Sequence, residues 1–148
     1  MIYIASDHAG FELKKILIDH LNSKGRKIED CGPAVFDKSD DYPDFILPCA
    51  QKVASGSPDA RGIVVGYSGT GEAIAANKVK GIRSAVYYGG SLDIVKLARE
   101  HNNANVLSLG AHFLKEGEAK KAVDLWLDTK YEGGRHDRRL KKIEAYEK

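Results

Sequence analysis

The chain has 148 residues, 43% of them hydrophobic and 30% charged, with a formal net charge of +2. These values are typical of one globular domain, and the interspersed charges exclude the basic surface of a nucleic-acid-binding protein. No apolar run reaches the roughly 18–20 residues of a membrane span, and the first residues lack the features of a signal peptide. We therefore expect a cytoplasmic protein without membrane or nucleic-acid partners, whose Cys31 and Cys49 are free thiols.

Apolar strands alternate with amphipathic helices along the whole chain. In chain order we expect a strand at residues 1–6, a helix at 11–24, a strand at 27–31, a helix at about 45–55, a strand at 63–65, a helix from about 72, a strand at 83–88, a helix at 91–100, a strand at 105–110, a helix at 117–128 and a basic tail helix at about 135–147. This alternation predicts an α/β sandwich with a five-stranded, mostly parallel sheet. No linker or repeat interrupts the pattern, so we expect a single domain over residues 1–148.

The stretch from Gly62 to Lys78 is the most informative part of the sequence. An apolar run is followed by glycines at 66, 69 and 71, and then by an Ala-rich segment that begins near Glu72. A strand, a glycine loop and a helix start together form an anion-binding arrangement, because backbone N–H groups and the helix dipole point at one spot. Glu72 has two interpretations: a first-turn acid favoured by the dipole, or a proton-transfer group, since a bound anion repels a neighbouring carboxylate.

Two cofactor interpretations of this loop are disfavoured. Its G-x-x-G-x-G spacing differs from the dinucleotide fingerprint, and it follows the third strand rather than the first. The next strand ends in Tyr87-Tyr88 instead of the acid that binds a ribose. No Gly-Lys-Ser/Thr follows the glycines, which argues against a nucleoside-triphosphate loop. We expect neither a cofactor nor a metal.

Ligands of parallel α/β sheets bind beyond the carboxyl ends of the strands. Asp7-His8 follows the first strand and belongs to that edge, although Asp7 can also serve only as a cap of the next helix. His101 precedes the fifth strand, so it reaches the same pocket only from a neighbouring molecule, which hints at a dimer with shared sites. Arg135 and Arg139 share a helix face and either fork onto one phosphate or belong to a solvated basic helix. These groups suit a small phosphorylated substrate.

Six ordered motifs identify the sequence as similar to a known family. They are Ser6-Asp7-His8-Ala9-Gly10, Asp41-Tyr42-Pro43, Gly69-Thr70-Gly71 with Ile74-Ala75-Ala76-Asn77-Lys78, Gly81-Ile82-Arg83, residues 99–105, and Gly133-Gly134-Arg135-His136. Together they resemble the ribose-5-phosphate isomerases of type B, in the family that also holds galactose-6-phosphate isomerase. The resemblance covers about residues 1–146. It implies a Rossmann-like three-layer fold in a homodimer, often paired into a homotetramer, with active sites shared between subunits.

The resemblance also implies an activity and a set of site residues. The activity is metal-free interconversion of ribose 5-phosphate and ribulose 5-phosphate through a cis-enediolate, in the pentose phosphate pathway. His101 and Asp7 are implied to open the furanose ring, with Asn102 assisting, and Tyr42 to form a wall of the sugar pocket. The implied phosphate ligands are His8, Arg135 and Arg139. The implied oxyanion donors are the backbone amides of the 68–72 loop, with Gly69, Thr70 and Gly71 at its centre.

Two positions depart from the commonest family pattern. Many members have a cysteine base where this chain has Gly66, and the subgroup with Gly-x-Ser-Gly-x-Gly-Glu uses the glutamate instead. This implies that Glu72 moves the proton between C2 and C1 while the Ser68 hydroxyl steadies the intermediate. His112 stands where an arginine commonly contacts phosphate, and histidine is shorter and only partly charged at neutral pH. Two alternatives therefore stay open: an isomerase of allose or galactose 6-phosphate, and a non-catalytic phosphosugar-binding module.

Overall fold

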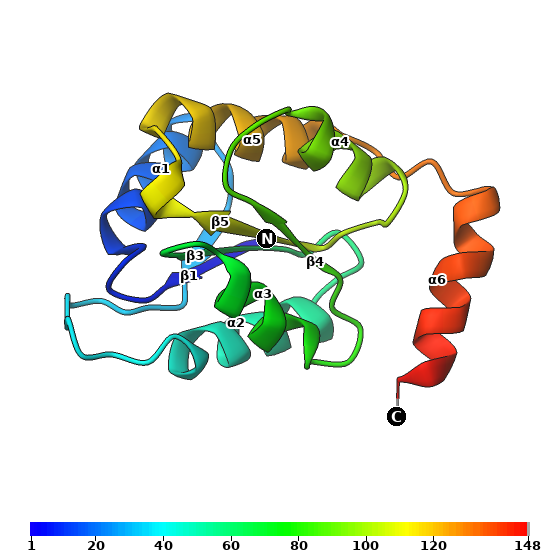
Figure 1. The fold of residues 1–148 in the computed structure, drawn as a ribbon, viewed down its shortest axis with the longest axis horizontal. Coiled ribbons are helices and arrows are strands. Elements are labelled where there is room, and N and C mark those ends of the chain that lie inside the picture. Colours follow the sequence, from blue (N-terminus) through cyan, green and yellow to red (C-terminus); the bar gives the residue numbers. More distant parts are fainter. Residues whose placement is uncertain (148) are drawn as a thin grey trace.

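The computed structural model describes residues 1–147 as one parallel β-sheet between two helical layers (Figure 1). The strands are β1 (Ile2–Ser6), β2 (Ile28–Asp30), β3 (Arg61–Gly66), β4 (Ser84–Tyr87) and β5 (Val106–Gly110). The helices are α1 (Phe11–Ser23), α2 (Pro43–Ser55), α3 (Thr70–Asn77), α4 (Asp93–Glu100), α5 (Glu116–Asp128) and α6 (Arg135–Tyr146), with a short 3-10 helix η1 at Ala111–Phe113. Lys148 lies outside the described residues, and the single domain expected over residues 1–148 stays a prediction.

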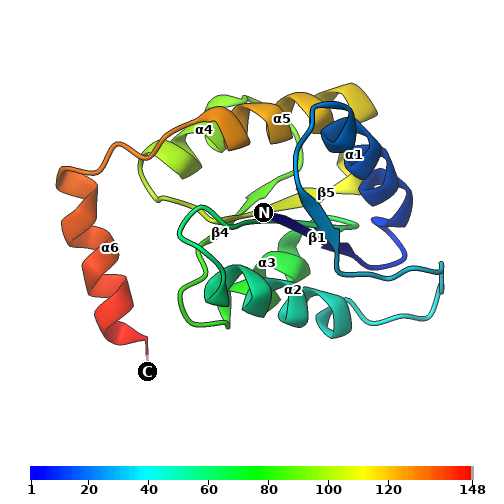
Figure 2. The ribbon, with the colours of Figure 1, turned by 180° about the vertical axis from the view of Figure 1, so that it is seen from behind.

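All five strands run parallel in the order β2-β1-β3-β5-β4. Helices α1, α4 and α5 cover one face of the sheet and α2 and α3 the other (Figures 1 and 2). The predicted three-layer α/β/α sandwich is confirmed, and the sheet is wholly rather than mostly parallel. At its centre Gly62 pairs with Val106 and Gly66 with Gly110, so the carboxyl ends of β3 and β5 share one edge.

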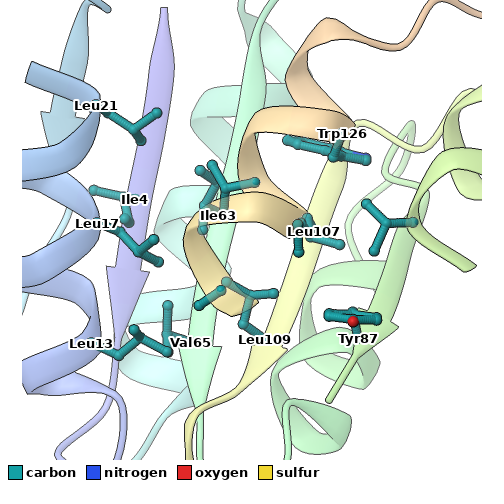
Figure 3. Packing of buried hydrophobic residues seen from close by; sticks show 14 of the residues in the cluster. Ile4, Leu13, Leu17, Leu21, Ile63, Val65, Tyr87, Leu107, Leu109 and Trp126 are labelled. Carbon is teal, nitrogen blue, oxygen red and sulfur yellow. The ribbon is translucent and has the colours of Figure 1, made fainter. Parts of the chain in front are cut away.

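Two apolar clusters fill the space between the layers. On one face, Leu13, Leu17 and Leu21 of α1 recur at helical spacing and pack with Trp126 of α5 against the sheet (Figure 3). On the other face, α2 contributes Ile46, Cys49, Ala50 and Val53 to the second cluster. Because both faces are covered, the central strands are mostly apolar, with Ser6 and Ser108 buried among the hydrophobic residues. The core therefore fixes the strand ends, from which the polar turns emerge.

One buried cation ties α1 to the chain beyond β2. Lys14 is only 1% exposed, and its ammonium donates hydrogen bonds to the carboxylate of Asp30 and to the carbonyl of Pro33, both at 2.7 Å. A buried charge is tolerated when such partners replace its water. This link anchors the start of the loop that joins β2 to α2.

Helix α6 stands apart from the sandwich at the end formed by β4 (Figures 1 and 2). Its far end is held by Glu147, whose carboxylate oxygens accept the Gly81 N–H at 3.1 Å. Between α6 and the body lies a groove of about 510 Å³ whose lining includes Asn102, Leu140 and Ile143. Among residues 1–147, no helix is long and apolar enough to cross a membrane.

Candidate active site

A buried carboxylate lies at the carboxyl edge of the sheet, in the first turn of α3. The side chain of Glu72 is only 4% exposed and folds back over the last residue of β3. A Cβ atom placed on Gly66 would lie 1.8 Å from Oε1 of Glu72, so the carboxylate occupies the space that a side chain at position 66 would fill. Any residue other than glycine at position 66 would therefore displace the Glu72 carboxylate from this position.

A second carboxylate follows β1 at the same edge. Asp7 is buried, and its Oδ1 accepts the N–H of Gly10 at 3.1 Å. Burial is the main cause that raises the pKa of Glu72; a backbone hydrogen bond lowers it, and the charge of Asp7 raises it further. A raised pKa makes a carboxylate a better proton acceptor and brings its protonated and ionised forms closer in energy, which suits a general acid–base group.

The glycine loop turns between these acids and α3. Gly69 has φ of +81°, a left-handed conformation that glycine adopts without steric cost, and its carbonyl accepts the Ala73 N–H at 3.0 Å. The hydroxyl of Ser68 accepts the Thr70 N–H at 3.2 Å. The first amides of a helix lack partners within it, so this turn presents N–H donors to the site. The ring of Tyr42 lies against the glycine loop, because a Cβ atom placed on Gly71 would lie 2.8 Å from its Cζ atom.

His8 and His112 line one groove of about 560 Å³ next to this loop, together with Tyr67. The imidazole of His112 stacks on the Tyr67 ring, with centroids 4.2 Å apart and an interplanar angle of 13°. His8 is held from the other side by Asp40, whose carboxylate contacts Nδ1 at 2.6 Å. The hydrogen bond to Asp40 is the largest influence on the pKa of His8 and raises it, so a positive charge at this groove is favoured.

The other predicted site residues lie at the opposite edge of the sheet. His101 ends α4 and precedes β5, at the end of the sheet where Gly62 pairs with Val106. It stacks on His136, with centroids 4.3 Å apart, close to the start of α6 where Arg135 is exposed. Asn102 follows His101, and Arg139 lies one turn further along α6. The structure thus divides the predicted site into two groups, as the order of the elements indicated for His101.

Among residues 1–147, two trios of side chains bring potential metal-ligand atoms close together. In Asp7, His8 and Asp40, and in His101, Glu132 and His136, one ligand atom from each residue lies within 4.8 Å of the others. In the first trio, His8 and Asp40 are close because they form a hydrogen-bonded pair. In the second, the two imidazoles are nearly parallel at 21°, so their in-plane lone pairs do not converge on one point. Neither trio is assigned as a metal centre.

Asp40 is the site residue that sequence reasoning missed. It lies between the strand expected at 27–31 and the helix expected at about 45–55, 32 residues from His8, and no periodicity marks it. The only signal was its place beside the Asp41-Tyr42-Pro43 motif. Cys31 and Cys49 are free thiols, as expected, and each is the largest influence on the pKa of the other: the pKa of Cys31 is lowered and that of Cys49 is raised.

Comparison with known proteins gives the family of the chain. The sequence profile described as Ribose/Galactose Isomerase matches residues 2–143. The probable ribose-5-phosphate isomerase B of Mycoplasma genitalium is 48% identical over 147 residues, covering 99% of this chain and 95% of the relative. The ribose-5-phosphate isomerase B of Mycolicibacterium paratuberculosis is 43% identical over 148 residues, covering 99% and 91%.

Solved structures give the same relationship. The crystal structure of ribose-5-phosphate isomerase B from Mycoplasma genitalium with bound ribulose-5-phosphate aligns with a TM-score of 0.94 at 47% identity, covering 99% of this chain and 95% of that one. Ribose-5-phosphate isomerase B from Clostridium thermocellum aligns with a TM-score of 0.92 at 44% identity, covering 99% and 96%. The similarity spans nearly the entire sequence. This chain belongs to the ribose/galactose isomerase family.

Proposed function

We propose that the protein is a ribose-5-phosphate isomerase of type B, a cytoplasmic enzyme that interconverts ribose 5-phosphate and ribulose 5-phosphate in the pentose phosphate pathway. The observation that carries the proposal is the buried carboxylate of Glu72 over Gly66, beside the amides of the glycine loop. An aldose–ketose isomerase needs one base that removes a proton from C2 and returns it to C1. Three relatives that are 40–48% identical over 90–95% of their length carry the ribose-5-phosphate isomerase B name, one of them as probable.

Glu72 is proposed as that base, which places the enzyme in the subgroup that uses glutamate. With the sugar in its open-chain form, the carboxylate removes the C2 proton, a C1–C2 double bond forms, and the carbonyl electrons move to O1. A proton then passes from O2 to O1, and the protonated Glu72 delivers its proton to C1 as O2 becomes the ketone. The raised pKa of Glu72 narrows the energy difference between its two protonation states, so neither half of the exchange is blocked.

The glycine loop is proposed to hold the negative charge of the enediolate. The amides of Gly69, Thr70 and Gly71 lie at the start of α3, where unpaired N–H groups and the helix dipole favour an anion. Donors arranged in advance stabilise a developing oxyanion more than mobile water does. Ser68 already accepts the Thr70 N–H, so its hydroxyl proton stays available to the intermediate.

Ring opening and phosphate binding are proposed to need two subunits. Glu72, Asp7 and His8 lie at one edge of the sheet, whereas His101, Asn102, Arg135 and Arg139 lie at the other. In a homodimer, alone or paired into a tetramer, the second group reaches the site of the neighbouring subunit. His101 and Asp7 then move the protons that open the furanose ring, while the two arginines join His8 and His112 around the phosphate.

A substrate panel tests this function. A coupled assay offers ribose 5-phosphate, allose 6-phosphate and galactose 6-phosphate to the wild type, to Glu72→Gln and to the exposed control Glu144→Gln. We expect turnover of ribose 5-phosphate, a loss of about 10²–10⁴ in kcat for Glu72→Gln with substrate binding kept, and an unchanged control.

Other outcomes would replace the proposal. Preferential turnover of a six-carbon substrate would assign a different sugar, which the stacked His112 in place of an arginine makes a specific alternative. Turnover of none of the three would leave a phosphosugar-binding module. Full activity of Glu72→Gln would remove the carboxylate from the mechanism.

A further inference from the structure

Asp40 contacts His8 at two atoms. His8 lines the groove that it shares with Tyr67 and His112, which we call the phosphate groove. The Oδ1 atom of Asp40 accepts the backbone N–H of His8 at 3.0 Å and lies 2.6 Å from Nδ1 of the His8 ring. The Asp40 side chain is 6% exposed, whereas that of His8 is 36% exposed. The acid is thus the buried half of the pair, and the imidazole is the half that reaches the surface.

This contact fixes what the imidazole presents to a ligand. With Nδ1 directed at Asp40, Nε2 is the ring nitrogen left for the groove that His8 shares with Tyr67 and His112. In the cationic form both ring nitrogens carry protons, and Nε2 donates to a phosphate oxygen. In the neutral form with its proton on Nδ1, Nε2 is only an acceptor and repels phosphate.

We infer that Asp40 is a positioning residue for the sugar phosphate, because it holds the His8 imidazole with Nε2 toward the phosphate groove. This inference rests on the proposed function, in which His8 is a phosphate ligand. Asp40 also keeps the imidazole cationic to higher pH, since a buried carboxylate beside the ring favours the charged form. The enzyme then binds a phosphate dianion at a pH at which a free histidine has lost most of its charge.

The surroundings of His8 contain other charges that a pH argument must include. After the hydrogen bond to Asp40, burial lowers the pKa of His8, and the charges of Asp7, Asp40 and Asp37 raise it. Glu12 of α1 and Glu116 of α5 line the same groove as His8 and His112. Asp40 differs from the other acids because it alone among the named groups touches the ring, so its removal acts on both orientation and charge.

The alternative is that Asp40 only anchors its loop through the His8 N–H. The variant Asp40→Asn separates the two roles, because an amide oxygen still accepts that N–H while the negative charge is lost. Asp41→Asn is the matched control: it removes the same charge at the next position, its side chain is exposed, and it is not among the groups that shift the pKa of His8.

The experiment measures steady-state kinetics on ribose 5-phosphate and inhibition by inorganic phosphate between about pH 5.5 and 8.5, with the His8 titration followed by NMR. For Asp40→Asn we expect a KM and a phosphate inhibition constant that rise about tenfold near pH 8 and little near pH 5.5, kcat within about twofold, and a His8 titration moved to lower pH. Asp41→Asn should match the wild type. In a His8→Gln background, Asp40→Asn should have no further effect on KM, because the two residues act as a unit.

The inference is overturned if Asp40→Asn weakens binding equally at every pH, if it lowers kcat alone, or if its effect persists without His8. The NMR titration and inorganic-phosphate binding need no turnover. A wild type that binds phosphate through His8 but converts no ribose 5-phosphate would therefore refute the proposed activity and leave the role of Asp40 standing.

Discussion

Burial of the ionised Glu72 carboxylate lowers the stability of the folded protein, and the proposed active site depends on this burial. Burial raises the pKa of Glu72, so the folded state binds the proton more tightly than the unfolded chain does. By linkage, the contribution of Glu72 to stability is greatest at pH below its unfolded pKa and is lost as pH rises through the raised folded value. The ionised form of Glu72, which the proposed mechanism requires as the base, is thus the less stable form of the fold.

Gly66 is a residue-scale test of this arrangement. Gly66→Ala places a Cβ atom 1.8 Å from the present position of Oε1 of Glu72, so the carboxylate must move. Because a misplacement of about 1 Å costs on the order of 10²-fold in rate, we expect kcat to fall at least that far. Gly117→Ala is the control, since its Cβ meets nothing within 4 Å, and it should keep wild-type kcat. Wild-type kcat in Gly66→Ala would show that Glu72 works from another position.

At the scale of elements, sequence periodicity predicted every main strand and helix, and the errors lie at their ends. Helix α2 was expected to begin near residue 45 and begins at Pro43, because proline suits the first turn, where its missing N–H is not needed. Helix α4 begins at Asp93 rather than Ser91, whose hydroxyl still accepts the Asp93 N–H at 3.1 Å. Local patterns specify elements well because each depends on near neighbours in sequence.

Contacts between elements were less predictable. The strand order β2-β1-β3-β5-β4 could not be predicted from the sequence. Parallel strands buried on both faces are all apolar runs of similar composition, so their sequences do not show which strands are neighbours. The pairing of His8 with Asp40 joins a turn to a loop 32 residues away, and neither partner shows in a periodic pattern. The same holds for Lys14, which sequence alone presents as an ordinary charged helix residue.

Lys14 provides the element-scale prediction. Lys14→Met keeps much of the buried volume but removes the donors to Asp30 and to the carbonyl of Pro33. Because an unpaired buried acceptor, here the carbonyl of Pro33, costs about 1–3 kcal/mol, we expect urea denaturation to show a loss of unfolding free energy of that order. The exposed neighbour Lys15→Met should change it by less than about 0.5 kcal/mol. Equal stability of the two variants would mean that the Lys14 link contributes little.

At the scale of the whole molecule, the two groups of site residues lie on opposite edges of one subunit. The position of His101 before β5 allowed this separation to be predicted. In a parallel sheet, the turns that precede strands lie at one edge and the turns that follow strands lie at the other. How one subunit meets another was not predictable from the sequence, since an interface depends on surfaces built from many distant segments. The active site shared between subunits stays a prediction.

Subunit mixing tests the shared site. Glu72→Gln and His101→Asn should each be inactive alone, because each lacks one half of the chemistry. In a mixed dimer one site carries both defects and the other carries none. Random 1:1 mixing should therefore restore about a quarter of wild-type activity. The control is Glu72→Gln taken through the same mixing procedure alone, which should stay inactive. If verified mixed dimers recover no activity, both residues belong to the site of the same subunit.

Under the proposed mechanism, in which Glu72 is the base, the overlap between Gly66 and Glu72 also limits how such an enzyme can change its base during evolution. A cysteine at position 66 and the present carboxylate require the same space, so a chain cannot hold both groups in these positions at once. Replacing Gly66 by cysteine displaces the old base before the new one is tuned, and losing Glu72 first leaves a site with no base. Neither order of single substitutions passes through an intermediate with an intact base. The two kinds of catalytic site are therefore separated by a fitness valley, and a family tree should divide at this pair of positions more cleanly than at the rest of the pocket.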